Sequence, residues 1–365
     1  MSFFFVLIIG FLAVSSGFAQ VDSLSGIVNA YTPVLDLYNG SDADPDSLKI
    51  ENPDMFSAND KVLLIQMKGA VPDGSTQYQL IDDIHNAGKY EILVTAFVNT
   101  ADSLIGFSAP LLNNYDPDEG VQLVRVPHHD RIFVEDTIKG AAWDGQTGGV
   151  IALIANRTLV LDAPVIANYL GFPGGNPLSE VYNGVCASTD NAYNHLNFTA
   201  SAVDSAGLKG EGIYYSGYPY VRGMGRAGNG GGGGNGRYAG GYGGGNIGEG
   251  GRGGNEIDTC AALSRNIKKA KIPSAYYYDN RLFMGGGGGA GTQESPGQAS
   301  AGGRGGGIVI LVADSLIGHH HAISVTGESV IDLAGNAGAG GGGAGGVLAG
   351  GVDHILGELT INIRG

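Results

Sequence analysis

The chain has 365 residues, of which 66 are glycine, and only 15% of its residues are charged. Its formal net charge of −15 argues against a nucleic-acid partner, because phosphate contacts need a surplus of lysine and arginine. Residues 1–140 hold 7 basic and 19 acidic side chains, whereas residues 141–365 hold 13 and 16. An acidic front followed by a nearly neutral, glycine-rich back indicates two units.

The first residues are typical of a secretory signal peptide. The apolar run over residues 3–14 is too short to span a bilayer as a helix, and Gly17 and Ala19 are small residues placed for cleavage before Gln20. No lysine or arginine precedes the run, which departs from the usual pattern, and a buried strand or helix is the alternative. We expect residues 1–19 to direct export and no later segment to span a membrane.

Residues 20–57 form an aspartate-rich lead segment. Asp42, Asp44 and Asp46 are spaced two apart, as carboxylates are in calcium-binding loops, but the positions where an EF-hand needs glycine and glutamate hold other residues. A solvated acidic turn is the simpler interpretation, and calcium binding at Asp42–Asp46 stays open. The acidic turn around Asp116 is interpreted in the same way.

Residues 58–140 are expected to form a small antiparallel β barrel or sandwich of about five or six strands. Runs rich in β-branched and aliphatic residues alternate there with turns rich in Gly, Pro, Asn and Asp. The runs cover residues 61–69, 90–98, 102–108, 121–127 and 131–138.

Residues 141–365 are expected to form a glycine-rich repeat β domain. Residues 148–171 and 306–327 share one plan: two glycines, an apolar strand, a polar step and a second strand. Residues 345–365 are a third, looser copy, and its abrupt end suggests a fragment of something longer. A repeat of about 20 residues suits the rungs of a parallel β-helix or stacked sheet, which must stack to bury a core.

The first strands of the repeat, residues 150–155 and 308–313, are apolar at every position, which is typical of strands buried on both faces. No sustained helical periodicity offers a cover, so we expect the glycine tracts to supply it. Such tracts are either flexible linkers or polyproline II strands packed in layers, where only glycine permits close backbone approach. We favour packed layers, although the order of residues 223–254 stays open.

Cys186 and Cys260 are the two cysteines of the chain. In an exported protein a lone pair is more often a disulfide than two free thiols. We therefore expect a Cys186–Cys260 disulfide, with two separate inert thiols as the alternative.

Tyrosines mark a possible surface for stacking on a carbohydrate, since each offers a flat apolar face and a polar tip. They are Tyr276, Tyr277 and Tyr278, together with Tyr214, Tyr215, Tyr218 and Tyr220. The alternative is that these rings cap the glycine layers.

Histidines at 319–321 and at 128–129 were considered as metal ligands. His319 and His321 would face one side of an extended chain, but no cysteine or acidic neighbour in sequence completes the set. An exposed polar turn is the simpler interpretation, and we expect no metal and no cofactor.

Parallel β-helices often carry polysaccharide-cleaving enzymes, and the active sites of such enzymes need two converging carboxylates. Asp82 and Asp83 are adjacent, so in an extended segment they point to opposite faces. No nucleophile elbow occurs either, and we expect no enzyme. The arginine–glycine segment around Arg222 and Arg226 is similar to RNA-binding segments, but export and the acidic net charge oppose that function.

Several motifs follow one another in a familiar order: VLLIQMKG, GKYE, LLNNYD through VQLVRVP to AAWDGQTGGVIAL and GFPGG, RAGNGGGGGNGRYAGGYGGGN, RLFMGGGGGAG, GGGIVIL and GAGGGGAGGV. Over residues 58–365 this order resembles the N-terminal region of large glycine-rich secreted or surface proteins of gliding, type IX-secreting bacteria. The resemblance implies a compartment, secreted and at the bacterial cell surface, and an architecture, but no ligand or reaction.

Together these observations predict a non-catalytic extracellular structural or adhesion module. Its expected partners are other domains of a full-length surface protein or cell-surface polysaccharide. The alternatives are a carbohydrate-active enzyme on a β-helix scaffold and a lectin-like carbohydrate-binding module.

Overall fold

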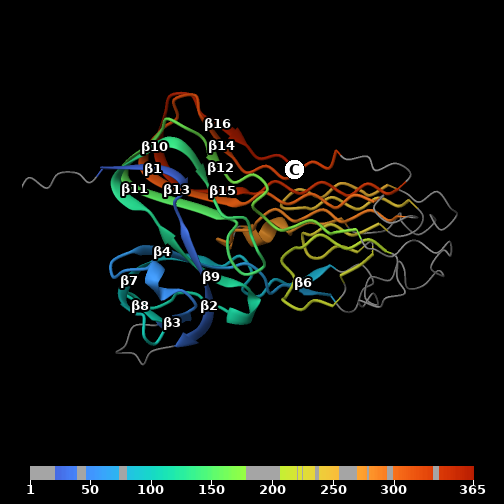
Figure 1. Ribbon diagram of the computed structural model, residues 1–365, viewed down its shortest axis with the longest axis horizontal. Helices are drawn as coiled ribbons and strands as arrows, with labels where there is room; N and C mark the ends of the chain where they lie inside the picture. Colours follow the sequence, from blue (N-terminus) through green and yellow to red (C-terminus); the bar gives the residue numbers. More distant parts are fainter. Residues whose placement is uncertain are drawn as a thin grey trace, which may run out of the picture.

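The computed structural model describes residues 21–38, 47–73, 80–177, 206–219, 221–223, 225–234, 238–254, 269–277, 279–293, 299–331 and 337–365. Within these residues the regular structure is β-strand, with the short 3-10 helices η1 (Pro53–Met55), η2 (Pro117–Glu119) and η4 (Ser274–Tyr277) between strands. The all-β class expected from the sequence is confirmed. The strands gather at one end, and the glycine-rich segments run side by side away from them (Figure 1).

Six antiparallel strands close into a small barrel in the order β2-β3-β8-β7-β4-β9. They are β2 (Ala30–Tyr38), β3 (Ser47–Ile50), β4 (Lys61–Gln66), β7 (Tyr90–Asn99), β8 (Leu104–Phe107) and β9 (Val121–Val126), and a small hairpin of β5 (Val71–Pro72) and β6 (Ile81–Asp83) lies outside the barrel. Leu64 and Leu123 point into the barrel against Phe107, whereas their neighbours Leu63 and Val124 point outward into a second core. Alternating side chains therefore let β4 and β9 serve two cores at once.

The second sheet is parallel and curls into a half-barrel. Its strands are β1 (Val21–Ile27), β10 (His128–Lys139), β11 (Val150–Leu161), β12 (Val165–Ile166), β13 (Ile308–Ile317), β14 (Ala322–Ser324), β15 (Val347–Leu356) and β16 (Thr360–Asn362). The long β10 pairs with β11 along one half and with β12 along the other, so the path β15-β13-β11-β10-β12-β14-β16 folds back on itself. Each repeat thus forms one rung of a long strand, a turn and a short strand.

The rungs stack in register, as the sequence repeat predicted. Val150 pairs with Ile308, and Ile308 pairs with Val347. In the short strands Ile323 pairs with Val165 on one side and with Ile361 on the other. Within the long strands the pairing shifts by one residue between Ile154 and Thr158, where β11, with 12 residues, is longer than β13, with 10.

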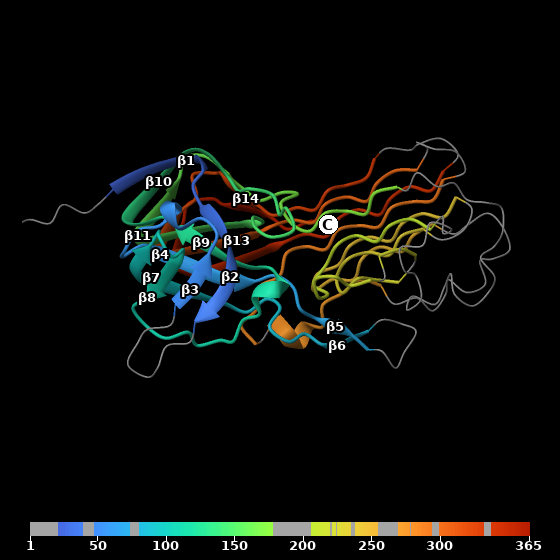
Figure 2. The same ribbon diagram turned by 60° about the horizontal axis from the view of Figure 1, so that its bottom comes forward.

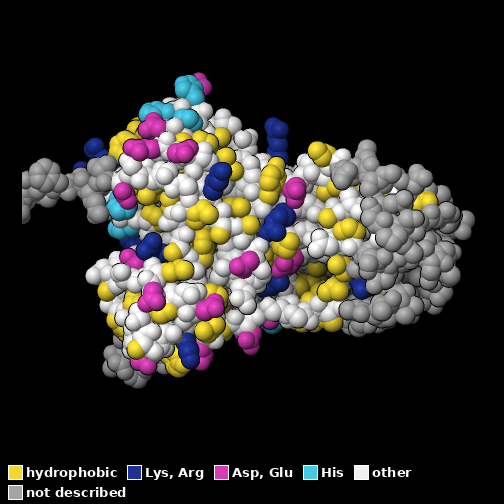
Figure 3. All heavy atoms as spheres, in the orientation of Figure 1, with side chains coloured by type: hydrophobic (Ala, Val, Ile, Leu, Met, Phe, Trp, Pro, Cys, Tyr) yellow, Lys and Arg dark blue, Asp and Glu magenta, His cyan; other side chains and the backbone are white. Residues whose placement is uncertain are grey.

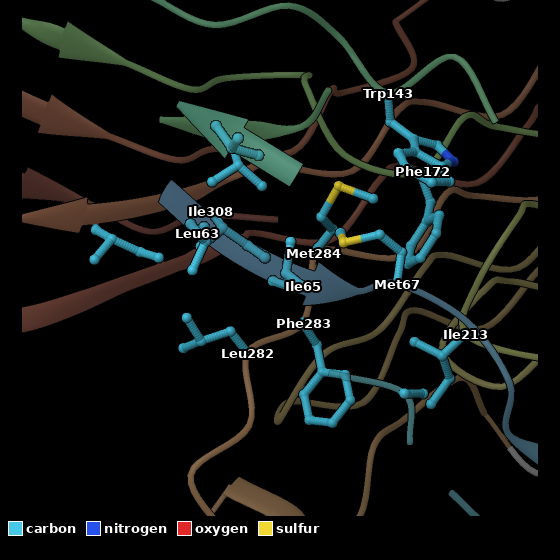
Figure 4. Packing of buried hydrophobic residues seen from close by; sticks show 14 of the residues in the cluster. Leu63, Ile65, Met67, Trp143, Phe172, Ile213, Leu282, Phe283, Met284 and Ile308 are labelled. Atoms are coloured by element: carbon cyan, nitrogen blue, oxygen red, sulfur yellow. The ribbon is translucent and has the colours of Figure 1, made fainter. Parts of the chain in front are cut away.

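Residues 150–155 are buried on both faces, as predicted, but their cover differs from the expected one. One face packs into the half-barrel, where Ile151 and Leu153 meet side chains of neighbouring rungs. The other packs on the outside of the barrel, where Ile65 and Met67 lie against Met284 and Phe172 (Figure 4). The glycine tracts instead continue the strands beyond their N-terminal ends, because the curl of the sheet and the barrel already cover both faces.

The boundary predicted at residue 58 does not coincide with a boundary between the sheets. β2 and β3 complete the barrel, and β1 joins the parallel sheet along β10. In β2 the side chain of Val34 is buried and that of Asp36 is exposed, so this aspartate lies on the solvent side of the strand. The acidic composition of residues 20–57 therefore gave no indication of the strands β1, β2 and β3.

Hydrogen bonds tie the glycine segments together with a repeat of three residues, centred on residues 285–292. Gly285 and Gly288 donate to residues 306 and 303 (both 2.9 Å), residues 286, 289 and 292 to 245, 242 and 239 (2.8–3.1 Å), and residues 287 and 290 to 211 and 208 (3.0 and 2.8 Å). Three further segments, represented by Gly175, Gly231 and Gly341, donate amides to carbonyls of the same stretch. Residues 285–292 are thus surrounded by six neighbouring segments, which Figure 2 shows running alongside one another.

Glycine is required in this interior because backbone meets backbone. A β-carbon added at each of Gly285, Gly286, Gly287, Gly288 and Gly289 would overlap the carbonyl oxygen of a neighbouring segment. The composition of these tracts is therefore explained by packing rather than by chain flexibility.

Candidate functional site

A cavity of about 290 Å³ opens where residues 206–218 cross the loop that follows β4. Its side chains come from distant parts of the sequence, and we name it the tyrosine–lysine cavity. The residues that give it its character are Lys68, Lys209, Glu211, Tyr214, Tyr215 and Tyr218.

Backbone hydrogen bonds hold the two walls of the cavity together. The amides of Gly69 and Ala70 donate to the carbonyl oxygen of Ile213 at 3.1 and 3.0 Å, and the amide of Tyr215 donates to that of Ala70 at 3.0 Å. Asn229, which is fully buried, accepts from the amide of Ile213 through its side-chain oxygen at 3.0 Å. The tyrosines are therefore fixed to the barrel as an added strand would be.

Lys209 lines the cavity with only 7% of its surface exposed. Its Nζ lies 5.7 Å from the centre of the Tyr218 ring, within the range of a cation–π contact. Burial lowers the pKa of the amine to about 7, because the charged form loses its water. At neutral pH the cavity therefore holds an amine that exchanges readily between the charged and neutral forms.

Three tyrosine rings pack together, and one of them, Tyr218, faces this amine. The Tyr214 and Tyr218 rings are 4.9 Å apart and tilted by 57°, and the Tyr215 and Tyr218 rings are 5.7 Å apart and perpendicular. Burial raises the pKa of Tyr214 to about 12. The three tyrosines that the sequence singled out at 214, 215 and 218 are thus brought together.

Glu211 forms the opposite, charged side of the cavity. Its carboxylate lies 2.6 Å from Lys68 Nζ and accepts a hydrogen bond from Trp143 Nε1 at 3.0 Å. Lys68 balances the charge of Glu211, and the Lys209 amine faces the Tyr218 ring. This arrangement can stack a flat ring on tyrosine and hold an anionic or hydroxyl group against the amine.

The consecutive tyrosines at 276–278 have a different environment. Tyr276 lies in η4, partly buried against the core between the barrel and the sheet. The Tyr277 side chain and all of Tyr278 lie outside the described residues. Tyr276 therefore contributes to the core.

The histidine turn meets carboxylates from neighbouring rungs. His319 Nδ1 lies 2.7 Å from Asp162, and His320 Nδ1 lies 3.0 Å from Glu358. Figure 3 shows histidines gathered at one end of the molecule. Over the described ranges, however, no three His, Cys, Asp or Glu side chains come together as metal ligands do. The turn is a set of exposed histidine–carboxylate contacts across rungs.

Other predicted sites have structural partners or lie outside the described residues. Glu119 accepts from the amide of Ser216 at 2.6 Å and so fastens the cavity wall, while burial raises its pKa. Arg226 is buried and donates to the carbonyl of Lys269 at 3.2 Å, and Arg222 is buried as well. Residues 1–19, the acidic turn at Asp42, Asp44 and Asp46, and both Cys186 and Cys260 lie outside the described residues.

Sequence reasoning missed Lys209 and Glu211. The two stand within a glycine-rich stretch, and no periodic pattern gives the direction of their side chains. Only the proximity of two charged residues to the tyrosines at 214–218 could have drawn attention to them.

Comparison with protein-family models, with curated proteins and with solved structures finds no match to this chain. In the part of the chain that the structure describes, no helix is long and apolar enough to cross a membrane.

Proposed function

We propose that this chain is a non-catalytic extracellular module with a structural or adhesive role in a secreted cell-surface protein. The observation that supports it is the glycine-rich bundle around residues 285–292, which continues the parallel sheet as an extended, closely packed body.

We further propose that the bundle consists of polyproline II strands. A polyproline II helix has three residues per turn, so every third residue faces the same neighbour. The amide donors of residues 285–292 follow this repeat on three sides. Inter-strand hydrogen bonds, which an isolated polyproline II helix lacks, offset the entropy that glycine loses on ordering.

Such a bundle suits a spacer better than a catalyst. Its interior is backbone, so it offers few side chains for chemistry but resists bending because each strand is bonded to several others. A rigid arm of this kind would hold neighbouring domains of a surface protein, or a bound polysaccharide, away from the cell envelope.

A lectin-like module is the second candidate, and the tyrosine–lysine cavity favours it. Tyrosine rings at Tyr215 and Tyr218 and the Lys209 amine are suited to a saccharide ring that carries a carboxylate or sulfate. Cavities that bury a small ligand are of about this size or larger.

The test measures binding of the protein to polysaccharide and cleavage of the polysaccharide in the same experiment. The purified protein is passed over immobilised acidic and neutral polysaccharides while release of reducing ends is measured. Retention without release supports an adhesive module, and loss of retention on acidic polymer in Tyr215→Ala, but not in Tyr90→Phe, assigns it to the cavity. Release of reducing ends that survives repurification would refute the non-catalytic proposal and favour the enzyme alternative.

A further inference from the structure

The last rung of the parallel sheet exposes side chains that are buried in the rung before it. Leu316 of β13 is 2% exposed, whereas its partner Ile355 of β15 is 57% exposed. Ile323 of β14 is 1% exposed, whereas its partner Ile361 of β16 is 48% exposed. The two rungs have the same pattern, so the difference is that β13 and β14 have a following rung and β15 and β16 have none among the described strands.

The edge of this rung is also a free hydrogen-bonding edge. β15 pairs with β13 on one side only, and β16 pairs with β14 on one side only, over the ranges that the structure describes. A strand edge of this kind presents unpaired amide and carbonyl groups, and these can direct the addition of another strand.

A groove of about 730 Å³ continues this edge along the glycine bundle. It runs between residues 240–254 and residues 339–346 and reaches Val347 and Ile363 of the last rung at its inner end. Of the 24 residues that line it, 15 are glycine, and Tyr238, Glu249 and Arg252 are among the others. A β-carbon at Gly251 would have no atom within 4 Å, in contrast to the overlaps around Gly288.

Unused amides in this groove follow the three-residue repeat. Residues 338, 341 and 344 donate to the central segment 285–292, and Gly343 and Gly346 donate to Glu328 and Val325. Among the described residues, the amides of Ala339, Gly342 and Gly345 make no backbone hydrogen bond, and all three line the groove. One face in three of this segment is therefore unfilled, and its donors lie about 9 Å apart if the strand is polyproline II.

We propose that this open end binds a polypeptide segment in which a glycine tract is followed directly by an apolar β-strand, as a further parallel rung. The glycine tract fills the groove, with carbonyls at the same three-residue repeat accepting from Ala339, Gly342 and Gly345. The strand pairs with β15 and covers Ile355.

The chain itself shows that this kind of segment fits such an edge. A glycine immediately precedes each first strand, at Gly149, Gly307 and Gly346, and the strands that follow pair in register. The rung now open is a looser copy of the rung on which it lies, and its first strand also follows a glycine tract.

A second copy of the chain is a poor occupant. The other free edge of the sheet belongs to β1, and no glycine tract precedes it in the sequence. Two copies pairing through β15 about a two-fold axis would be antiparallel, so their glycine tracts would point in opposite directions and leave both grooves empty.

The experiment uses a fluorescent peptide with the sequence of residues 302–317, GGRGGGIVILVADSLI, and the full protein. We expect saturable one-to-one binding, and slower hydrogen exchange at the amides of Gly342 and Gly345 in the complex. A peptide with alanine in place of its five glycines keeps the strand but cannot enter the groove, and we expect it to bind at least about tenfold more weakly.

A matched protein variant tests the same surface. Ile355 and Ile361 are half exposed, so we expect the double variant Ile355→Lys, Ile361→Lys to keep its fold, as measured by circular dichroism. We expect its affinity for the peptide to fall by at least about tenfold. Equal binding of the alanine peptide, no binding of the glycine peptide, or concentration-dependent oligomers of the protein alone in sedimentation each overturn the proposal. None of these measurements involves polysaccharide, so the result is independent of the proposed adhesive function.

Discussion

The Cα of Gly288 faces the carbonyl oxygen of Gly341 so closely that no β-carbon fits between them. The two residues lie in segments separated by 53 positions, and the amide of Gly341 donates to Gly289 at 2.9 Å. Backbone contact of this kind explains why the chain can use glycine as a packing residue.

We predict that Gly288→Ala destabilises the protein by about 1–3 kcal/mol, because the methyl group must displace a neighbouring strand. Gly251→Ala is the matched control, since it lies in the same bundle with no atom within 4 Å of the new carbon. The control should be neutral or slightly stabilising through the entropy of the unfolded chain. Urea midpoints measure both. Equal midpoints for the two variants would show that the bundle tolerates side chains.

A second prediction compares register partners on adjacent rungs. Leu316→Asp places an unpaired charge in a side-chain position that is 2% exposed and should cost several kcal/mol, enough to prevent folding. Ile355→Asp makes the same change in its partner, which is 57% exposed, and should shift stability by less than about 1 kcal/mol. Thermal unfolding followed by circular dichroism distinguishes them, and a folded Leu316→Asp variant would contradict the buried-rung arrangement.

The third prediction concerns pH. Burial lowers the pKa of Lys209 to about 7 in the folded chain, while the unfolded chain keeps the ordinary value near 10.5. Between these values the unfolded state binds the extra proton, so stability should rise with pH from 7 to about 9 at roughly 1 kcal/mol per pH unit. Below pH 7 both states are charged and the slope disappears.

Lys209→Met is the control for this slope, because it keeps the length and apolar stem of the side chain. We expect its stability to be flatter over pH 7–9 in urea titrations. If wild type and variant have the same slope, the amine is not buried in solution as it is in the structure.

The fourth prediction is the Cys186–Cys260 disulfide, which rests on the even cysteine count and on export. Thiol labelling of the denatured, unreduced protein should find no free thiol. Two labelled cysteines per chain would disprove the bridge, and labelling after reduction serves as the positive control.

Part of the fold could be predicted from the sequence because its signals are local. The repeat units at residues 148–171 and 306–327 gave the rungs, and continuous apolar runs gave strands buried on both faces. The three strands before residue 58 were missed because Asp36 and its neighbours lie on a solvent face, where polar composition carries no information about pairing. The prediction that glycine tracts cover the faces of β11 was wrong, because the sequence of one strand does not indicate which distant surface packs on it.

The candidate site was predictable only in its aromatic half. Tyr214, Tyr215 and Tyr218 are close in sequence and stay close in the fold. Glu211 acquires its role from Trp143 and Lys68, which come from distant loops. Long-range contacts of this kind have no signature in a glycine-rich segment.

The three-residue repeat of the bundle restricts which insertions and deletions its segments can accommodate. The central segment 285–292 has three faces, and the amides on each face donate to a neighbour of their own. Inserting or deleting three residues within residues 285–292 moves every later residue along the bundle but returns it to the same face. Inserting one residue turns all later positions by a third of a turn and presents each amide to the wrong neighbour. Bundles of this type should therefore lengthen and shorten in multiples of three.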